Sequence, residues 1–264
     1  MKRPVEVNGV GIHTGVSSCV TLHASDEKGI RIHTPRGTVP LLASLVTDTS
    51  RCTVLRCGDA SISTVEHLLA ACTALGVSAL DVYIDSEELP IGDGACGFWM
   101  DALQRLDVGS GAPLWQPIPH ALEVFGENGA FIGVYPSQNP TISVLIQFPD
   151  DVVGTMAARW DNRVSNFRET VASARTFGFR SEVEQLLAAG LGRGGSLENC
   201  IIVEGLGYAT PLRMPNEPAM HKLLDVVGDL GLCGCLPLAD VIAVRPSHKL
   251  NVDVSRRLTT MWEK

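Results

Sequence analysis

The chain has 264 residues, of which 45% are hydrophobic and 19% charged, and its net charge at pH 7 is −8. This composition predicts a compact folded protein with enough residues for one large domain or two small ones. The acidic balance, without any run of basic residues, argues against a nucleic-acid-binding protein, because phosphate contacts need clustered Lys and Arg.

The sequence also argues against a membrane protein or a secreted one. The longest apolar stretch, residues 67–80, is interrupted by Thr73, Gly76 and Ser78 and is too short to span a bilayer. Residues 1–15 have a basic start without an apolar core behind it, so we expect no signal peptide. The eight cysteines form no C-x-x-C pair, which favours free thiols. We therefore expect a cytoplasmic protein, and we take it to be a monomer.

Strand-like segments and two helices make up residues 1–108. β-Favouring residues between Gly, Asp and Pro breaks predict strands over residues 17–25, 29–35, 52–57 and 79–86. A helix is expected over 63–77, capped by Ser63 or Thr64, with Glu66 at capping-box spacing from Ser63. A turn-rich segment and a short helix over 98–106 follow. Residues 109–118 are rich in Gly and Pro and predict a linker.

The part from residue 119 to residue 264 repeats this plan. Strands are expected over residues 121–126, 129–136, 141–149, 199–205 and 239–246, and helices over 181–190 and 217–234. Each half thus has several strands, one long apolar helix, a Gly and a further strand, without measurable sequence identity between the halves. Strands clustered ahead of a helix favour an α+β fold with domains at 1–108 and 119–264.

The two long apolar helices that the sequence predicts also carry several polar side chains. His221, Asp225 and Asp229 recur every four residues and therefore share one helix face. Glu66 and His67 lie within the helix of the first half. A solvated face and a buried core histidine are the ordinary explanations, and a catalytic site is the alternative.

A zinc site would account for these residues together. Catalytic zinc takes three protein ligands and leaves one position for water, and His221, Asp225 and His67 offer three if the halves face each other. Glu66 could then act as general base, and His248 as general acid. The spacing alone does not distinguish this arrangement from chance. The ligand set suits Zn²⁺ but also admits Fe²⁺.

Whole phrases of the sequence carry a more specific signal. They are "GVGIHTG", "ISTVEHLLAACTALGV", "PIGDGACGF", "SARTFGF", "GLGRGGSLENCIIVE", "HKLLDVVGDL" and "SHKLN". In this order and spacing, the chain resembles the zinc-dependent UDP-3-O-acyl-N-acetylglucosamine deacetylases of lipid A synthesis from about residue 7 to residue 255. The resemblance implies two α+β domains, with their helices sandwiched between two sheets and the active site at the domain junction. It also implies a UDP-linked acylated amino sugar as the small-molecule substrate.

The resemblance assigns a role to each matching residue. Its zinc ligands correspond to His67, His221 and Asp225, and its general base to Glu66. The general acid corresponds to His248 with Asp229 beside it, and the oxyanion donor to Thr176. Lys222 and Phe177 match substrate-binding residues. The segment at about 178–204 matches an insert that forms a hydrophobic passage for the acyl chain, in which Phe179, Leu186, Leu187 and Ile201 either line the passage or belong to the core.

Two departures concern the substrate. The family usually shows an aromatic residue closely followed by His-Pro, where this chain has "FPDDVVG" at 148–154, and it commonly has a basic residue where this chain has Met220. Losing a positive group near a diphosphate should weaken binding of UDP-sugars. From the matched phrases we expect the family's hydrolysis of the acetamide of UDP-3-O-acyl-N-acetylglucosamine. The two departures leave the same chemistry on another N-acyl amino sugar as the alternative. A metal-holding binding protein without catalysis is less favoured, because it has no use for a positioned acid and base. His13, although in a matched phrase, is expected to be structural or exposed.

Overall fold

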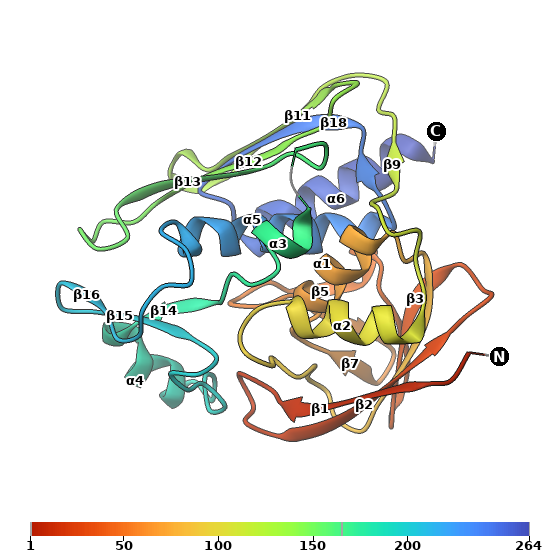
Figure 1. Ribbon diagram of the computed structural model, residues 1–264, viewed down its shortest axis with the longest axis horizontal. Coiled ribbons are helices and arrows are strands. Elements are labelled where there is room, and N and C mark those ends of the chain that lie inside the picture. Colours follow the sequence, from red (N-terminus) through yellow and green to blue (C-terminus); the bar gives the residue numbers. More distant parts are fainter. Residues whose placement is uncertain (1, 165, 264) are drawn as a thin grey trace.

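The computed structural model describes residues 2–164 and 166–263. Figure 1 shows three layers, with one β-sheet at the top of the view, a second at the bottom and helices between them. This is the α+β sandwich that the sequence predicts.

The first sheet has five strands in the order β1-β2-β8-β3-β4. They are β1 (Val5–Val10), β2 (Ser17–Ala24), β3 (Gly29–Thr34), β4 (Gly37–Pro40) and β8 (Ala79–Ile84). All neighbouring strands are antiparallel except β3 and β8, which pair in parallel. Alternate residues such as Val20, Leu22 and Ile32 are fully buried on the helix side, as expected for a sheet with one face in the core.

The second sheet repeats this order as β10-β11-β18-β12-β13. Its strands are β10 (Leu122–Phe125), β11 (Phe131–Pro136), β12 (Ile142–Gln147), β13 (Thr155–Trp160) and β18 (Ala239–Val244). Again one pair, β12 with β18, is parallel. The architectural repeat is therefore present in topology and strand direction. The domain boundaries at 108 and 119 stay a prediction; within the expected linker, β9 (Trp115–Gln116) pairs with β17 (Leu236–Pro237).

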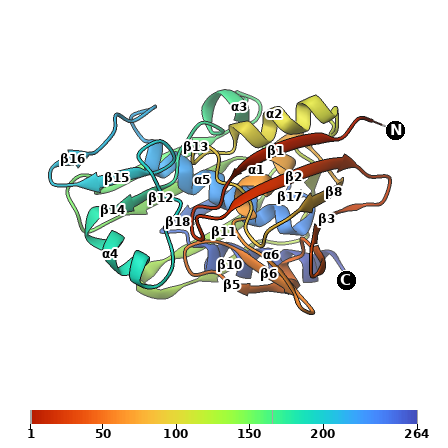
Figure 2. The ribbon, with the colours of Figure 1, turned by 90° about the horizontal axis from the view of Figure 1, so that it is seen from below.

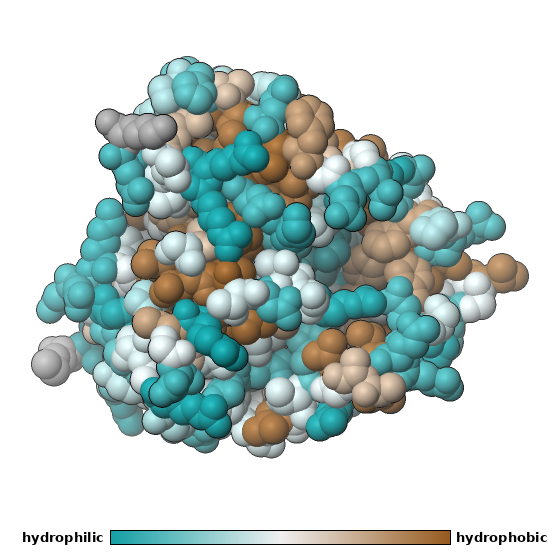
Figure 3. Space-filling view, turned by 180° about the vertical axis from the view of Figure 1, so that it is seen from behind, coloured by the Kyte–Doolittle hydropathy of each residue, from teal (hydrophilic) through white to brown (hydrophobic). Residues whose placement is uncertain are grey.

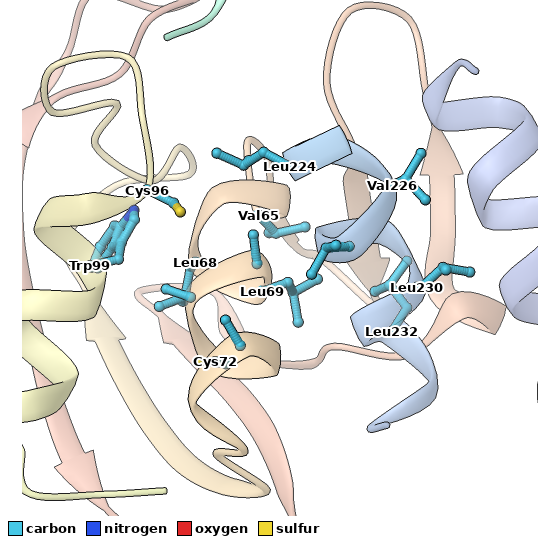
Figure 4. Close-up of a cluster of buried hydrophobic side chains, with 14 of the residues drawn as sticks. Val65, Leu68, Leu69, Cys72, Cys96, Trp99, Leu224, Val226, Leu230 and Leu232 are labelled. Atoms are coloured by element: carbon cyan, nitrogen blue, oxygen red, sulfur yellow. The ribbon is translucent and has the colours of Figure 1, made fainter. Parts of the chain in front are cut away.

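Two helices from corresponding places in the two halves pack against each other at the centre. These are α1 (Glu66–Leu75) and α5 (Glu217–Leu230), flanked by α2 (Gly97–Leu106) on the side of the first sheet and α6 (His248–Trp262) on the side of the second. Figure 4 shows apolar side chains of α1, among them Leu68 and Leu69, between α2 and α5. Thirteen of the fourteen residues of α5 are buried, so its polar side chains lie inside the protein and do not form a solvated face.

The capping prediction for α1 is wrong. The N-cap is Val65, which offers no side-chain acceptor, and Thr64 has a left-handed φ of 60°. The hydroxyls of Ser63 and Thr64 instead donate to the Glu87 carbonyl and the Glu88 carboxylate. The segment that follows β8 lies alongside residue 63 and attracts both hydroxyls, which is a tertiary effect that local spacing cannot reveal.

Each half carries an additional unit between its fourth strand and its central helix. In the first half this unit is a small sheet of β5 (Val46–Asp48), β6 (Val54–Cys57) and β7 (Ala60–Ile62). In the second half it contains α3 (Phe167–Thr170), α4 (Arg180–Ala188) and the strands β14 (Phe177–Phe179), β15 (Ile201–Glu204) and β16 (Gly207–Tyr208). Figure 2 shows the α4 and β14–β16 unit, here called the insert, at one end of the molecule. Short 3₁₀ turns occur at Ala43–Leu45, Glu127–Gly129 and Gly231–Cys233.

Helix α6 was not predicted from the sequence, which contains the β-branched residues Val252 and Val254 in this stretch. The helix forms because Ser247 caps it by accepting the Leu250 N–H, and because Val254 and Leu258 bury one face. All eight cysteines are free thiols. Within the described residues, no helix combines the length and the hydropathy that a membrane span requires.

Candidate metal centre and active site

A cavity of about 650 Å³ opens where the N-terminal ends of α1 and α5 meet the insert. Eight of the nine predicted site residues line it, namely Glu66, His67, Thr176, Phe177, His221, Lys222, Asp225 and His248. The ninth, Asp229, is fully buried behind His248. The structure thus brings together in one place residues that lie far apart in the sequence.

The three predicted metal ligands form one compact group. One ligand atom from each of His67, His221 and Asp225 lies within 4.8 Å of the others, and all three residues are buried. The Nδ1 atom of His67 is 3.3 Å from the Ala95 carbonyl, and that of His221 is 3.1 Å from the Ala174 carbonyl. Each ring can therefore donate from Nδ1 to a backbone oxygen, which leaves the Nε2 lone pair for a metal.

The donor set fits a divalent metal ion. Asp225 receives a hydrogen bond from Lys222 Nζ on Oδ2, at 2.8 Å, whereas its Oδ1 is buried without a hydrogen-bond partner among the described residues. An orphaned carboxylate oxygen is costly in a protein interior, and a bound cation would satisfy it. Two imidazoles and one carboxylate, with room for water, are the ligands of a catalytic zinc site.

The electrostatics keep these groups in the protonation states that a metal requires. Burial, with a smaller contribution from His221, lowers the pKa of His67 to about 4, and burial also lowers the pKa of His221. Burial by itself would raise the pKa of Asp225, but the nearby charge of Lys222, with a smaller contribution from His221, outweighs it and lowers that pKa. At neutral pH both rings are thus neutral and the carboxyl is ionised, which is the liganding form of each.

Glu66 lies beside this group and has the properties of a general base. It is 3% exposed, and burial raises its pKa to about 7, an effect that the nearby His248 partly offsets. Its Oε2 accepts the backbone N–H of Thr53 at 3.1 Å. Its Oε1 lies 3.9 Å from His248 Nε2. A carboxylate with a pKa close to neutrality can both take and release a proton at that pH.

His248, the first residue of α6, is paired with a carboxylate from α5. Its Nδ1 lies 2.8 Å from Asp229 Oδ2, which also accepts Asn251 Nδ2 at 2.9 Å. Burial would lower the pKa of His248, but the charge of Asp229 outweighs it and raises that pKa to about 9. The imidazolium is therefore the form present at neutral pH, ready to donate from Nε2 into the cavity.

Thr176 and Phe177 reach the cavity because a buried ion pair holds the segment before them. Arg175 meets Glu217, at the start of α5, through two bonds of 2.8 and 3.0 Å, and both side chains are buried. The Thr176 N–H donates to the Gly94 carbonyl. Lys222 Nζ lies 5.9 Å from the centre of the Phe177 ring. The bidentate pair thus fixes the segment against the helix that carries His221 and Asp225.

The cavity extends into the insert as an apolar arm, defined here by Phe179, Val183, Leu186, Leu187 and Ile202. Ile201 does not line it, because successive strand residues face opposite sides and Ile201 is fully buried on the other side of β15. On the face shown in Figure 3, hydrophobic residues are exposed in several places, among them the end of the molecule that carries the insert.

The two departures from the family pattern have different surroundings. Phe148 lines the cavity and its ring centre lies 5.6 Å from that of Phe177. Met220 does not line the cavity; it shares a shallow hollow with Leu145 and Ile242 on the second sheet. The departure at position 220 therefore concerns packing on the second sheet, and the cavity lining is not affected by it.

Several residues around the site were not found from the sequence. His13 lines the cavity, with Nδ1 buried and unpartnered among the described residues, although it was expected to be structural or exposed. Glu88 accepts four hydrogen bonds from residues 13, 14 and 64 and so holds the loop of His13 against the start of α1. Asn251 lies at helical spacing from His248, which is a signal that could have found it. Nothing in the sequence singles out Thr53.

A buried pair of histidines and a carboxylate, beside a base of raised pKa and a protonated imidazole, defines the class of metal-dependent hydrolases. The comparisons agree with this class. The family model described as "LpxC: UDP-3-O-acyl N-acetylglycosamine deacetylase" matches residues 1–260, and the chain belongs to this family.

Relatives of the chain carry the name UDP-3-O-acyl-N-acetylglucosamine deacetylase. The one from Synechocystis sp. is 34% identical over 99% of this chain and 98% of its own length. The one from Nostoc sp. is 33% identical over 96% of this chain and 95% of its own length. The one from Chlamydia abortus is 34% identical over 98% of this chain and 95% of its own length.

Proposed function

We propose that this protein is a cytoplasmic, monomeric amidohydrolase that removes the acetyl group from UDP-3-O-acyl-N-acetylglucosamine and releases acetate, in the synthesis of lipid A. Family membership over nearly the whole chain supports the reaction. The observation that carries the chemistry is the His67, His221 and Asp225 group with Glu66 and His248 beside it in one cavity.

We infer that Zn²⁺ is the resident metal, held by His67, His221 and Asp225. When bound, it would polarise the acetamide carbonyl and make water more acidic. Lys222 occupies the second oxygen of Asp225 and so leaves one oxygen for the metal. Fe²⁺ is compatible with the same ligands.

The protein's own residues supply the proton transfers. Glu66, ionised, takes a proton from the water that attacks the acetamide carbon. The hydroxyl of Thr176 donates a hydrogen bond to the oxygen on which negative charge develops. His248 then gives its Nε2 proton to the nitrogen of the departing amine, and Asp229 stabilises the imidazolium until that transfer.

Substrate binding divides between the two ends of the cavity. The apolar arm of the insert offers a hydrophobic environment for an acyl chain. Lys222 and Phe177 both line the cavity and would contact the diphosphate and the glucosamine, Lys222 by charge and Phe177 by the face of its ring. The burial of the reacting groups keeps bulk water from competing with these contacts.

A second candidate is the same reaction on a different N-acyl amino sugar. The stretch that contains Phe148 favours it, because this cavity-lining residue is followed by Asp150 and Asp151 where the family usually has His-Pro. Turnover of acylated, non-acylated and nucleotide-free N-acetylglucosamine substrates separates the two candidates.

The test is deacetylation of UDP-3-O-acyl-N-acetylglucosamine by purified protein before and after removal of metal with a chelator. We expect turnover to vanish with the metal and to return with Zn²⁺. Glu66→Gln should bind one zinc per chain and lose turnover by roughly 100- to 10,000-fold. An enzyme that keeps full turnover without metal, or with Glu66→Gln, would contradict the mechanism. Size-exclusion chromatography with light scattering tests the monomer, and cell fractionation tests the compartment.

A further inference from the structure

Thr53 connects the two carboxylates of the site, although it belongs to neither helix that carries them. It lies directly before β6 and is fully buried. Its backbone N–H donates to Oε2 of Glu66 at 3.1 Å, and its hydroxyl donates to Oδ1 of Asp229 at 2.6 Å. One residue therefore contacts a carboxylate of α1 and a carboxylate of α5, which belong to different halves of the protein.

These two bonds determine which oxygen of each carboxylate faces His248. With Oε2 held by Thr53, Glu66 presents Oε1 to His248 Nε2 at 3.9 Å. With Oδ1 held by Thr53, Asp229 presents Oδ2 to His248 Nδ1 at 2.8 Å. The imidazole thus lies between two carboxylates whose rotation about their last side-chain bond is restricted by the same third residue.

Thr53 is also the only described hydrogen-bond donor to Oδ1 of Asp229, since the other two donors to this carboxylate, His248 and Asn251, both bind Oδ2. Asp229 is fully buried, so loss of the hydroxyl would leave one oxygen of a buried carboxyl group without a partner. A buried unsatisfied group of this kind is costly, and the carboxylate would rotate or move to find another donor.

We propose that Thr53 is a positioning residue for the deacetylation, which holds the general base and the partner of the general acid in their working orientation across the junction of the two halves. It acts through Glu66 and Asp229 and makes no contact with the substrate. For its kinetic test this inference rests on the proposed function.

The informative substitution is Thr53→Val, which keeps the shape and the backbone N–H but removes the hydroxyl. We expect kcat to fall roughly 10- to 100-fold, the loss expected for one hydrogen bond to a charged group, with KM and zinc content unchanged. Thr53→Ser retains the hydroxyl and should keep kcat within about threefold. Unchanged kcat in Thr53→Val, or an equal loss in Thr53→Ser, would overturn the proposal. If Thr53→Val does not fold, Thr53→Ala, which also lacks the hydroxyl, replaces it, and unchanged kcat in that variant would overturn the proposal in the same way.

A matched control comes from the second sheet. Thr141 is also a buried threonine whose hydroxyl donates to an aspartate, Asp240, at 2.7 Å, but it lies outside the cavity. Thr141→Val removes the same kind of hydrogen bond and should keep wild-type kcat. In a double-mutant cycle, Thr53→Val should cost less than about threefold when Asp229 is already Asn, because the residue through which it acts has changed. If the effects of Thr53→Val and Asp229→Asn on kcat are fully additive, Thr53 does not act through Asp229, and the inference is refuted.

A measurement without substrate separates the two proposals. The His248 ring resonances can be assigned in zinc-loaded, ¹⁵N-histidine-labelled protein by comparison with His248→Gln. Thr53→Val should shift the Nδ1–H resonance of His248, whereas Thr141→Val should not; an unshifted resonance would count against the inference. If the wild-type enzyme does not turn over the UDP-sugar, the proposed function fails while this result still decides the role of Thr53.

Discussion

A close backbone approach between α1 and α5 predicts the effect of a single added methyl group. A Cβ built on Gly228, in the middle of α5, would lie 2.2 Å from the Glu66 carbonyl oxygen and 2.9 Å from its carbonyl carbon. Ordinary contacts begin near 3.4 Å, so Gly228→Ala must push α1 and α5 apart by roughly 1 Å. The obstacle is backbone and cannot move aside as a side chain would.

That displacement acts directly on the site, because α1 carries Glu66 and His67 while α5 carries the other two metal ligands. Ligand distances tolerate about 0.2 Å, and a misplacement of 1 Å in a catalytic group costs roughly 100-fold in rate. We expect Gly228→Ala to lose about 1–3 kcal/mol of stability from overpacking, to bind zinc at least tenfold more weakly and to lose kcat by roughly 100-fold.

The assay is zinc affinity by competition with a chelating dye, together with kcat and thermal unfolding. Gly97→Ala is the control, since Gly97 also lies in a helix but its added Cβ would meet only the Ala172 carbonyl at 3.4 Å. This control should retain wild-type zinc affinity and kcat. A Gly228→Ala enzyme with wild-type zinc affinity and turnover would refute the argument that close helix contact sets the ligand geometry.

Four further predictions concern the general acid, a buried ion pair, the metal and the apolar arm. His248 must be protonated to donate, and its pKa is raised to about 9, so a pH–rate profile should show the rate falling as pH rises above about 9. Asp229→Asn removes the charge that raises this pKa, and the fall in rate should therefore move to lower pH. Glu217→Gln leaves Arg175 buried without its counter-charge and should cost about 3–5 kcal/mol in calorimetric unfolding, and a loss below 1 kcal/mol would contradict a buried pair. Metal removal should lower Tm, since zinc at a thousand times its Kd stabilises by about 4 kcal/mol, and a Tm indifferent to chelator would exclude a tightly held ion. Val183→Trp should fill the apolar arm and raise KM for long-chain substrates more than for short ones; equal changes would place the chain elsewhere.

The duplicated topology explains how the site is built from two halves. Each half delivers its central helix from the same position in its sheet, and the two helices pack together so that His67 lies beside His221 and Asp225. The metal ligands come from both helices, whereas the acid comes from the start of α6 and the apolar arm from the insert. The additional unit of the first half supplies Thr53, so both added units contribute to the site.

The sequence alone was sufficient for the family, the α+β class and half of the described strands, and eight of the nine residues expected to act line one cavity. Helical spacing placed His221, Asp225 and Asp229 on one face, and this face is buried as a site requires. These inferences hold because periodicity and long matching phrases are local properties of the chain, which the sequence records directly.

Other features depended on contacts between segments distant in sequence. The hydroxyl of Thr64 donates to Glu88 and does not cap α1 as expected. Ile202 lines the cavity in place of Ile201, and Met220 packs on the second sheet. Thr53 lies 176 residues from Asp229, and no local pattern relates the two. The chain determined which chemical groups were present, and tertiary packing decided which of them meet, because hydrogen bonds and close contacts depend on distances in space that sequence spacing does not encode.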